Sequence, residues 1–195
     1  ALSALVLLYR EVLAKPMGDL RRVLRSTSPT RLPAVLSRVE VGAVLGQMHG
    51  TSRLIALLLY GAGLRLMECL TLRVKDLDLV RGEIRVRRGK GGKDRVTVLP
   101  ASARPALEQH LERVRALHAR DLAEGAGHVA LPTALERKAP GWATDLAWQW
   151  VFPAARRYRD TESGEERRHH VHETAVQRAV QAAVRAAGIA KRATC

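Results

Sequence analysis

Apolar residues recur at a helical period over the stretch that precedes residue 61. Residues 41–48 carry apolar side chains at helical spacing, and Ser37 followed by Glu40 predicts a capping box at the start of this helix. The next run, 54–60, is apolar on nearly every side, which is typical of a central buried helix. A Gly-x-Gly sequence at 61–63 is expected to end this second helix.

The period changes from about 3.6 to 2 after one further short helix, expected over 64–72. Residues 74–79, 84–87 and 96–98 alternate between apolar and polar side chains, and glycine-containing turns separate the three runs. This pattern predicts three short antiparallel strands.

The second half of the chain returns to a helical period. Residues 102–122 carry one apolar stripe that includes Leu122, and residues 173–187 carry another. Between them, 131–140 could form a short helix or an ordered loop, and 158–170 has the turn residues of a second hairpin. We therefore predict an α+β fold that is mostly helical, with a small three-stranded antiparallel sheet and a second hairpin.

The best candidate for a linker is the stretch 26–33, which contains two prolines and several hydroxyl side chains. The residues before it already follow a helical pattern at the first position, and we interpret them as the tail of an element that starts upstream. We expect a fragment of two parts, in which 1–30 ends one domain and 31–195 forms part of another.

The charge of the chain narrows the class of its partner. Its 195 residues include 33 Lys and Arg against 19 Asp and Glu, a formal net charge of +14. The excess lies in residues 81–98 and at the two ends of the chain, 1–36 and 150–195, whereas 99–149 has none. This distribution favours a binding face for nucleic acid, because a basic surface gains affinity by releasing condensed counterions. A ribosomal protein and a membrane-surface protein are the alternatives.

The two cysteines, Cys69 and Cys195, have no spacing typical of a zinc site or a disulfide framework. No run approaches the roughly 18 apolar residues of a membrane helix. We expect a soluble, cytoplasmic protein without a membrane partner.

Two basic residues have the chemistry that a phosphodiester site requires. Arg65 follows the Gly-x-Gly sequence, and a guanidinium offers several donors to phosphate oxygens without losing its charge. Lys90 lies at the tip of a glycine-rich hairpin, where an ammonium can protonate a leaving oxygen. Two simpler interpretations stay open: Arg65 could pair with Glu68 or cap a helix, and Lys90 could be one of several phosphate contacts.

Three motifs in the first hundred residues resemble the catalytic domain of the tyrosine recombinases. They are Leu-Tyr-Gly-Ala-Gly-Leu-Arg-Leu-Met-Glu (59–68), Leu-Arg-Val-Lys-Asp-Leu-Asp (72–78) and Gly-Lys-Gly-Gly-Lys-Asp-Arg-x-x-x-Leu-Pro (89–100). Four later motifs are similar to those of the integron integrases within that family. These are Arg-Ala-Leu-His-Ala-Arg-Asp-Leu (115–122), Leu-Pro-Thr-Ala-Leu-Glu-Arg-Lys-Ala-Pro (131–140), Trp-Val-Phe-Pro (150–153) and Arg-Arg-His-His-Val-His-Glu-Thr (167–174).

The resemblance implies a role for each residue that matches a family motif. Residues 1–30 would end the core-binding, SAM-like domain, and 31–195 would form part of the catalytic domain. Arg65 would bind the scissile phosphate, Glu68 would help to hold that site, and Lys90 would be the general acid. Three neighbouring residues are expected to contact DNA: Arg87, Lys93 and Arg95.

The resemblance also implies a grip on bases that protrude from a folded single-strand recombination site. The stretch 131–140 matches an insertion associated with this grip, and Trp148 is the candidate for stacking on a base. The alternative is that the three tryptophans are ordinary core residues, and a metal site is a further alternative for the histidines. The hairpin contributes four expected DNA contacts: Arg167, Arg168, His169 and His170.

The chain departs from the family pattern at its C-terminus, beyond the segment Gly-Ile-Ala-Lys-Arg-Ala-Thr-Cys (188–195). Relatives have a His-x-x-Arg box, a later His or Trp and a nucleophilic tyrosine there, and none of Tyr9, Tyr60 and Tyr158 matches that tyrosine. We therefore expect a fragment that does not cleave DNA by itself. The parent enzyme would form a 3′-phosphotyrosine intermediate within a homotetramer on DNA, without a metal or nucleotide cofactor. A non-catalytic nucleic-acid-binding protein is the alternative.

Overall fold

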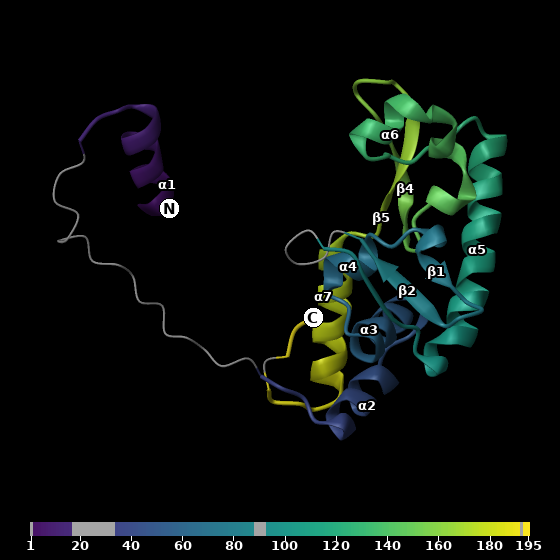
Figure 1. Cartoon of the computed structure of the whole chain (residues 1–195). Coiled ribbons are helices and arrows are strands. Elements are labelled where there is room, and N and C mark those ends of the chain that lie inside the picture. Colours follow the sequence, from purple (N-terminus) through teal and green to yellow (C-terminus); the bar gives the residue numbers. More distant parts are fainter. Residues whose placement is uncertain (1, 17–33, 88–92, 192) are drawn as a thin grey trace. The chain divides into compact units, whose positions relative to one another are not determined.

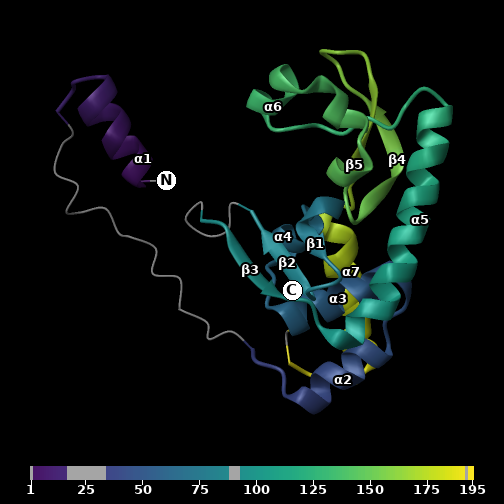
Figure 2. The same ribbon diagram turned by 45° about the vertical axis from the view of Figure 1, so that its right-hand side comes forward.

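The residues that the structure describes form a mostly helical fold with a three-stranded sheet and a separate two-stranded hairpin, both antiparallel (Figures 1 and 2). This architecture confirms the α+β class predicted from the sequence. The computed structural model describes residues 2–16, 34–87, 93–191 and 193–195.

The chain divides into two units, Ala1–Pro33 and Ala34–Cys195. In the first unit, the helix α1 (Leu2–Leu7) continues into a π-helical segment, Leu8–Val12. The predicted linker, 26–33, lies outside the described residues. That the first unit ends a core-binding domain stays a prediction.

The second unit is built around the helix α3 (Gly50–Ala62), whose Leu54, Ile55 and Leu58 are almost completely buried. α3 contacts the helices α2, α4, α5 and α7, which explains why its sequence is apolar on nearly every side. Before it, α2 (Arg38–Gly46) starts with the predicted capping box, in which Glu40 N–H donates to Ser37 Oγ (3.3 Å) and Ser37 N–H donates to Glu40 Oε2 (2.7 Å).

The predicted three-stranded sheet has the order β1-β2-β3, with β1 at Leu77–Asp78, β2 at Glu83–Val86 and β3 at Arg95–Val98. Ile84 and Val86 point into the core. The first predicted strand is shorter than expected, because Val74–Asp76 forms a 3-10 turn in which the Asp76 carboxylate accepts a bond from the Arg73 N–H (3.0 Å).

The long helix α5 (Arg104–Ala123) begins with a proline in its first turn, as predicted. Its apolar stripe is shorter than expected, since Leu122 is 43% exposed. The buried face of its last turns is formed by His118 and Asp121 instead. The sequence did not indicate this, because both residues are polar and their partners are distant in the chain.

A smaller group of elements packs beside the second half of α5 (Figures 1 and 2). It has its own apolar cluster of Val129, Leu131, Ala143 and Trp150. The predicted second hairpin is present here, and the insertion at 131–140 is a short helix. The elements are α6 (Thr133–Lys138), two 3-10 turns (Pro140–Thr144 and Leu146–Trp148), β4 (Pro153–Arg159) and β5 (Glu166–His170).

The helix α7 (Glu173–Ala186) packs against α2 and α3. It ends before Gly188, whose φ of 68° is the left-handed conformation that glycine adopts without strain. The short helix α4 (Leu66–Leu70) completes this part of the core. Within the described residues, none of the helices combines the length and the apolar character that spanning a membrane requires.

Candidate nucleic-acid interface

Arg65 lies where α3 gives way to α4. Gly63 takes the left-handed conformation (φ 63°) at the end of α3, and Arg65 is the extended residue that precedes α4. The Arg65 N–H donates to Glu68 Oε2 (2.9 Å), and its guanidinium Nη1 donates to Glu68 Oε1 (2.7 Å). The simpler interpretation, that Arg65 pairs with Glu68, is therefore seen. The side chain of Arg65 stays 57% exposed, so this pairing leaves it accessible to a ligand.

Glu68 joins Arg65 to Arg95 of β3. Arg95 donates through Nη1 to Glu68 Oε1 (2.9 Å) and through Nη2 to Glu68 Oε2 (2.7 Å), which is a bidentate pair. The hydrogen bonds from Arg95 lower the pKa of Glu68 to about 2. Burial acts in the opposite direction, and the hydrogen bond from the Arg65 N–H lowers the pKa further. Glu68 is thus ionised at neutral pH. Two guanidiniums share its single negative charge, so the Arg65–Glu68–Arg95 cluster keeps a net positive charge.

An open cavity of about 500 Å³ lies at this cluster. Gly63, Arg65 and Arg95 line it together with Lys93 and Asp94. Lys93 is exposed at this cavity, as its predicted contact with DNA requires. Lys90 lies outside the described residues, and its role as general acid stays a prediction.

A second cavity, of about 360 Å³, is also lined by Glu68. We call it the tryptophan cavity, because two indole rings form part of its wall. Its other lining residues include Arg73, Lys75, Arg87, Trp148 and Trp150. Glu68 lines the tryptophan cavity, and its carboxylate accepts hydrogen bonds from Arg65 and Arg95, which line the first cavity. The two cavities are therefore neighbours.

Trp150 is a buried residue of the tryptophan cavity, only 8% exposed. Its indole Nε1 donates to the carbonyl of Arg168 (3.1 Å), and the guanidinium carbon of Arg73 lies 3.2 Å from its ring centroid. Arg73 is further held by the carbonyls of Trp148 (2.7 Å) and Ala130 (2.8 Å). Burial lowers the pKa of Arg73 to about 10, so it stays charged at neutral pH. Trp150 is a core residue.

Trp148 is half-buried, and its ring has two neighbours. Trp142 stacks on it with centroids 5.3 Å apart and planes inclined by 21°, and the ammonium of Lys75 lies over its ring. Burial, together with the nearby charge of Arg87, lowers the pKa of Lys75 to about 8. Arg87 is bound through Nε to Asp76 Oδ1 (2.6 Å), yet its side chain is 45% exposed, and its contact with DNA stays a prediction.

Arg168 is a buried arginine of β5, 7% exposed. It donates to both carboxylate oxygens of Asp121 (2.7 and 2.8 Å) and to the carbonyls of Ala154 and Ala155 (2.7 and 2.8 Å). These bonds join α5 to the hairpin. A direct contact between Arg168 and DNA would require the side chain to leave all of them.

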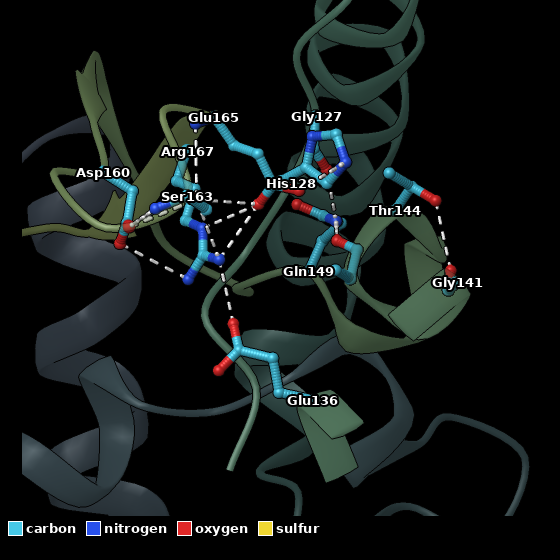
Figure 3. A network of polar contacts seen from close by, with 11 residues as sticks. Gly127, His128, Glu136, Gly141, Thr144, Gln149, Asp160, Ser163, Glu165 and Arg167 are labelled. Atoms are coloured by element: carbon cyan, nitrogen blue, oxygen red, sulfur yellow. Dashed lines mark hydrogen bonds and ion pairs between the residues drawn. The ribbon is translucent and has the colours of Figure 1, made fainter. Parts of the chain in front are cut away.

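Arg167 forms the centre of a second polar network, shown in Figure 3. Its Nη2 donates to Glu165 Oε2 (2.9 Å) and lies 2.9 Å from Glu136 Oε1 of α6, while Nη1 lies 3.5 Å from Asp160 Oδ2. The side chain is 10% exposed. Arg167 therefore ties α6 to the turn of the hairpin, and its predicted contact with DNA competes with three carboxylates.

His169 and His170 differ in exposure, because successive residues of a strand face opposite sides. His169 is exposed, and its ring centroid lies 5.8 Å from that of Trp150. His170 is buried, its Nδ1 lies 2.8 Å from the Val171 carbonyl, and burial lowers its pKa. Within the described ranges, no three His, Cys, Asp or Glu side chains are placed to hold a metal ion.

Residues 35–195 match the model of the phage integrase family, and this match covers most of the chain. The chain belongs to the phage integrase family. Its members are tyrosine recombinases, which confirms the wider family that the sequence motifs indicated. The integron subfamily is a finer assignment, which this match leaves open.

Two curated relatives are similar over the whole chain. An integrase/recombinase of Escherichia coli is 47% identical over 194 residues, which are 100% of this chain and 58% of the relative, and one of Pseudomonas aeruginosa matches with the same values. Tyrosine recombinase XerA of Thermococcus kodakarensis is 47% identical over 87 residues, 43% of this chain and 31% of the relative. The chain thus spans little more than half of the relatives that match it throughout.

A crystal structure of XerA recombinase has a similar fold. It superposes with a TM-score of 0.54 at 22% identity, over 98% of this chain and 55% of that chain. This likeness confirms the tyrosine-recombinase fold.

Sequence reasoning missed three residues that shape the site. Arg73 and Lys75 stand in the motif Leu-Arg-Val-Lys-Asp-Leu-Asp, but their aromatic partners follow more than seventy positions later. Asp121, the partner of Arg168, is 47 positions away from it. Lys75 stands at a polar position of the alternating pattern 74–79, so nothing in the local sequence indicates its contact with a ring.

Proposed function

We propose that this chain is the DNA-binding and partial catalytic region of an integron integrase. Such an enzyme cuts and rejoins DNA through a 3′-phosphotyrosine intermediate, and thereby inserts or excises gene cassettes. The observation that carries the proposal is the Arg65–Glu68–Arg95 cluster in a chain that belongs to the tyrosine recombinases. There, an accessible guanidinium is oriented by a carboxylate that is itself held by a second arginine.

Each residue of the cluster has a proposed part in phosphoryl transfer. Arg65 donates to the non-bridging oxygens of the scissile phosphate and stabilises the charge that develops on them. Glu68 fixes the orientation of Arg65, and Arg95 fixes Glu68. Lys90 protonates the departing 5′ oxygen. Lys93, Arg95 and Arg87 also contact the DNA backbone.

None of the three tyrosines is proposed as the nucleophile. Tyr158 lies on β4 opposite Arg167, Tyr60 lies near the end of α3, and Tyr9 belongs to the first unit. We propose that this chain binds DNA but does not cut it unaided, and that the whole enzyme acts as a homotetramer on DNA. A non-catalytic protein of ribosomal type is not favoured by the family match.

The tryptophan cavity and the hairpin are proposed to hold bases that protrude from a folded single-strand site. Trp148 offers a ring for stacking, and the exposed His169 can reach a base edge or a phosphate. The ring of the buried His170 lies 4.0 Å from that of His169, measured between centroids. Arg167 and Arg168 are proposed to serve DNA binding through the hairpin and α6, which they brace.

Affinity for two DNA ligands tests this proposal. We expect the chain to bind a folded single-strand site with protruding bases more tightly than the same sequence as a fully paired duplex. Trp148→Ala should reduce this preference by roughly 5- to 150-fold, the value of one base stacked on an aromatic ring. Tyr60→Ala, which removes an exposed ring elsewhere, is the control. Equal affinity of the wild-type chain for both ligands would exclude the integron assignment while leaving the family unchanged.

A further inference from the structure

The ring of Trp148 is already occupied by Lys75. The ammonium nitrogen lies 2.6 Å from the ring centroid, the position that a stacked base would take on that face. Trp142 stacks on the same indole with centroids 5.3 Å apart. A base therefore cannot stack on the face covered by Lys75 until the ammonium moves.

The charges around Lys75 explain why its ammonium lies against a ring. Asp76, the nearest acidic neighbour in sequence, is 4% exposed and is bound to the Arg87 guanidinium (2.6 Å) and the Arg73 N–H (3.0 Å). Arg73 and Arg87 repel a further cation, and Asp76 and Asp145 attract it. Burial, the largest cause, lowers the pKa of Lys75 to about 8, and the charge of Arg87 adds to this effect. The electron-rich indole face is the compensating contact.

We propose that Lys75 is a specificity-determining residue of the base site, because it competes with an extrahelical base for the ring of Trp148. The inference rests on the proposed stacking role of Trp148. A cation–π contact and a base–aromatic stack have comparable strength, so the contact with Lys75 selects against bases that stack weakly. Removal of the cation should therefore strengthen the contribution of the base, even though it removes a positive charge from a DNA-binding surface.

A pair of folded DNA sites isolates this contribution. The two sites are identical, except that one protruding nucleotide carries its base in the first and is abasic in the second. The ratio of their affinities for the chain, which we call the base preference, cancels the contacts with phosphates. Lys75→Met should raise the base preference roughly two- to tenfold. Lys191→Met, which removes an exposed lysine paired with Glu40 of α2, should leave it unchanged.

The pH dependence of the base preference gives a second readout. Since the pKa of Lys75 is lowered to about 8, its amine loses the proton, and with it the cation–π contact, between pH 7 and pH 9. The base preference of the wild-type chain should rise over this range. Lys75→Arg keeps a permanent cation, so its base preference should not rise with pH. The base preference of Lys75→Met should also be independent of pH, but at a higher value than that of Lys75→Arg.

The outcomes separate this inference from the function on which it rests. A base preference that falls in Lys75→Met would show that Lys75 binds the base. An unchanged base preference would show that Lys75 does not affect base binding. Either result overturns the inference, provided that Trp148→Ala lowers the base preference. If Trp148→Ala has no effect, the proposed stacking role fails and the inference fails with it. Equal thermal unfolding midpoints of the variants establish that they are folded.

Discussion

At the scale of single residues, Glu68 connects stability with the candidate phosphate site. Its side chain is 10% exposed, and its carboxylate holds both Arg65 and Arg95. An ionised carboxylate in this position stabilises the folded chain and at the same time orients the guanidinium that is proposed to bind phosphate. The loss of Glu68 should therefore be visible without any DNA.

Glu68→Gln is expected to lower the free energy of unfolding at pH 7 by about 3 kcal/mol. The pKa of Glu68 is lowered from 4.5 to about 2, so its stabilising contribution is complete above pH 4.5 and is lost as the pH falls toward 2. The difference between wild type and variant should shrink over this window. Urea unfolding at several pH values measures it. Glu112→Gln, which removes an exposed carboxylate paired with Arg115, should change stability by less than about 0.5 kcal/mol. A pH-independent difference for Glu68→Gln would contradict this account.

At the scale of elements, the contact between α3 and the turn after β3 depends on a glycine. A Cβ atom on Gly61 would lie 2.5 Å from Cγ and 2.9 Å from Cβ of Pro100, whereas one on Gly42 of α2 would meet no atom within 4 Å. Gly61→Ala should therefore destabilise the chain by about 1–3 kcal/mol, since the proline ring must shift. Gly42→Ala should stabilise it by about 0.4–1 kcal/mol. Thermal unfolding of both variants tests this, and equal effects would refute it.

The bond between α5 and the hairpin is a buried ion pair. Arg168→Ala leaves Asp121, 4% exposed, without its bidentate partner. We expect a loss of about 3–5 kcal/mol in the free energy of unfolding. Arg178→Ala, on the exposed face of α7, should cost less than about 0.5 kcal/mol. A cost of Arg168→Ala as small as that of Arg178→Ala would mean that the hairpin is held by other contacts.

Periodicity predicted the elements better than it predicted their polar contacts. The hairpin of β4 and β5 follows from its turn residues and the helix α7 from its apolar stripe, because both are properties of neighbouring residues. The contact of Asp121 with Arg168 joins residues 47 positions apart, and no local pattern contains it. Leu122 also departs from the local pattern, since it stands at a stripe position and is exposed, whereas its neighbour Asp121 is buried. Arg65 with Glu68 could be predicted, since the two are three positions apart.

At the scale of the whole molecule, ion pairs redistribute the charge that the sequence displays. The stretch 150–195 has an excess of basic residues, but several of its arginines are paired with acidic residues of α5, of its C-cap and of α6. In contrast, Arg65 and Arg95 share one carboxylate, and Arg87 and Lys93 stay exposed. Positive charge thus stays accessible around β2 and β3, next to the candidate phosphate site. The paired arginines of 150–195 are Arg157 with Glu124, Arg167 with Glu136 and Arg168 with Asp121.

The central claim is that Arg65 binds the scissile phosphate of a tyrosine recombinase. The most direct test extends this chain with the portion of the Escherichia coli relative that it does not match, and measures the covalent protein–DNA adduct on a folded single-strand site. Arg65→Ala should reduce adduct formation by roughly 10²- to 10³-fold, as expected when a donor to developing charge is removed. DNA affinity should change far less, and Arg178→Ala should form the adduct like the wild type. An Arg65→Ala variant that forms the adduct at the wild-type rate would contradict the account.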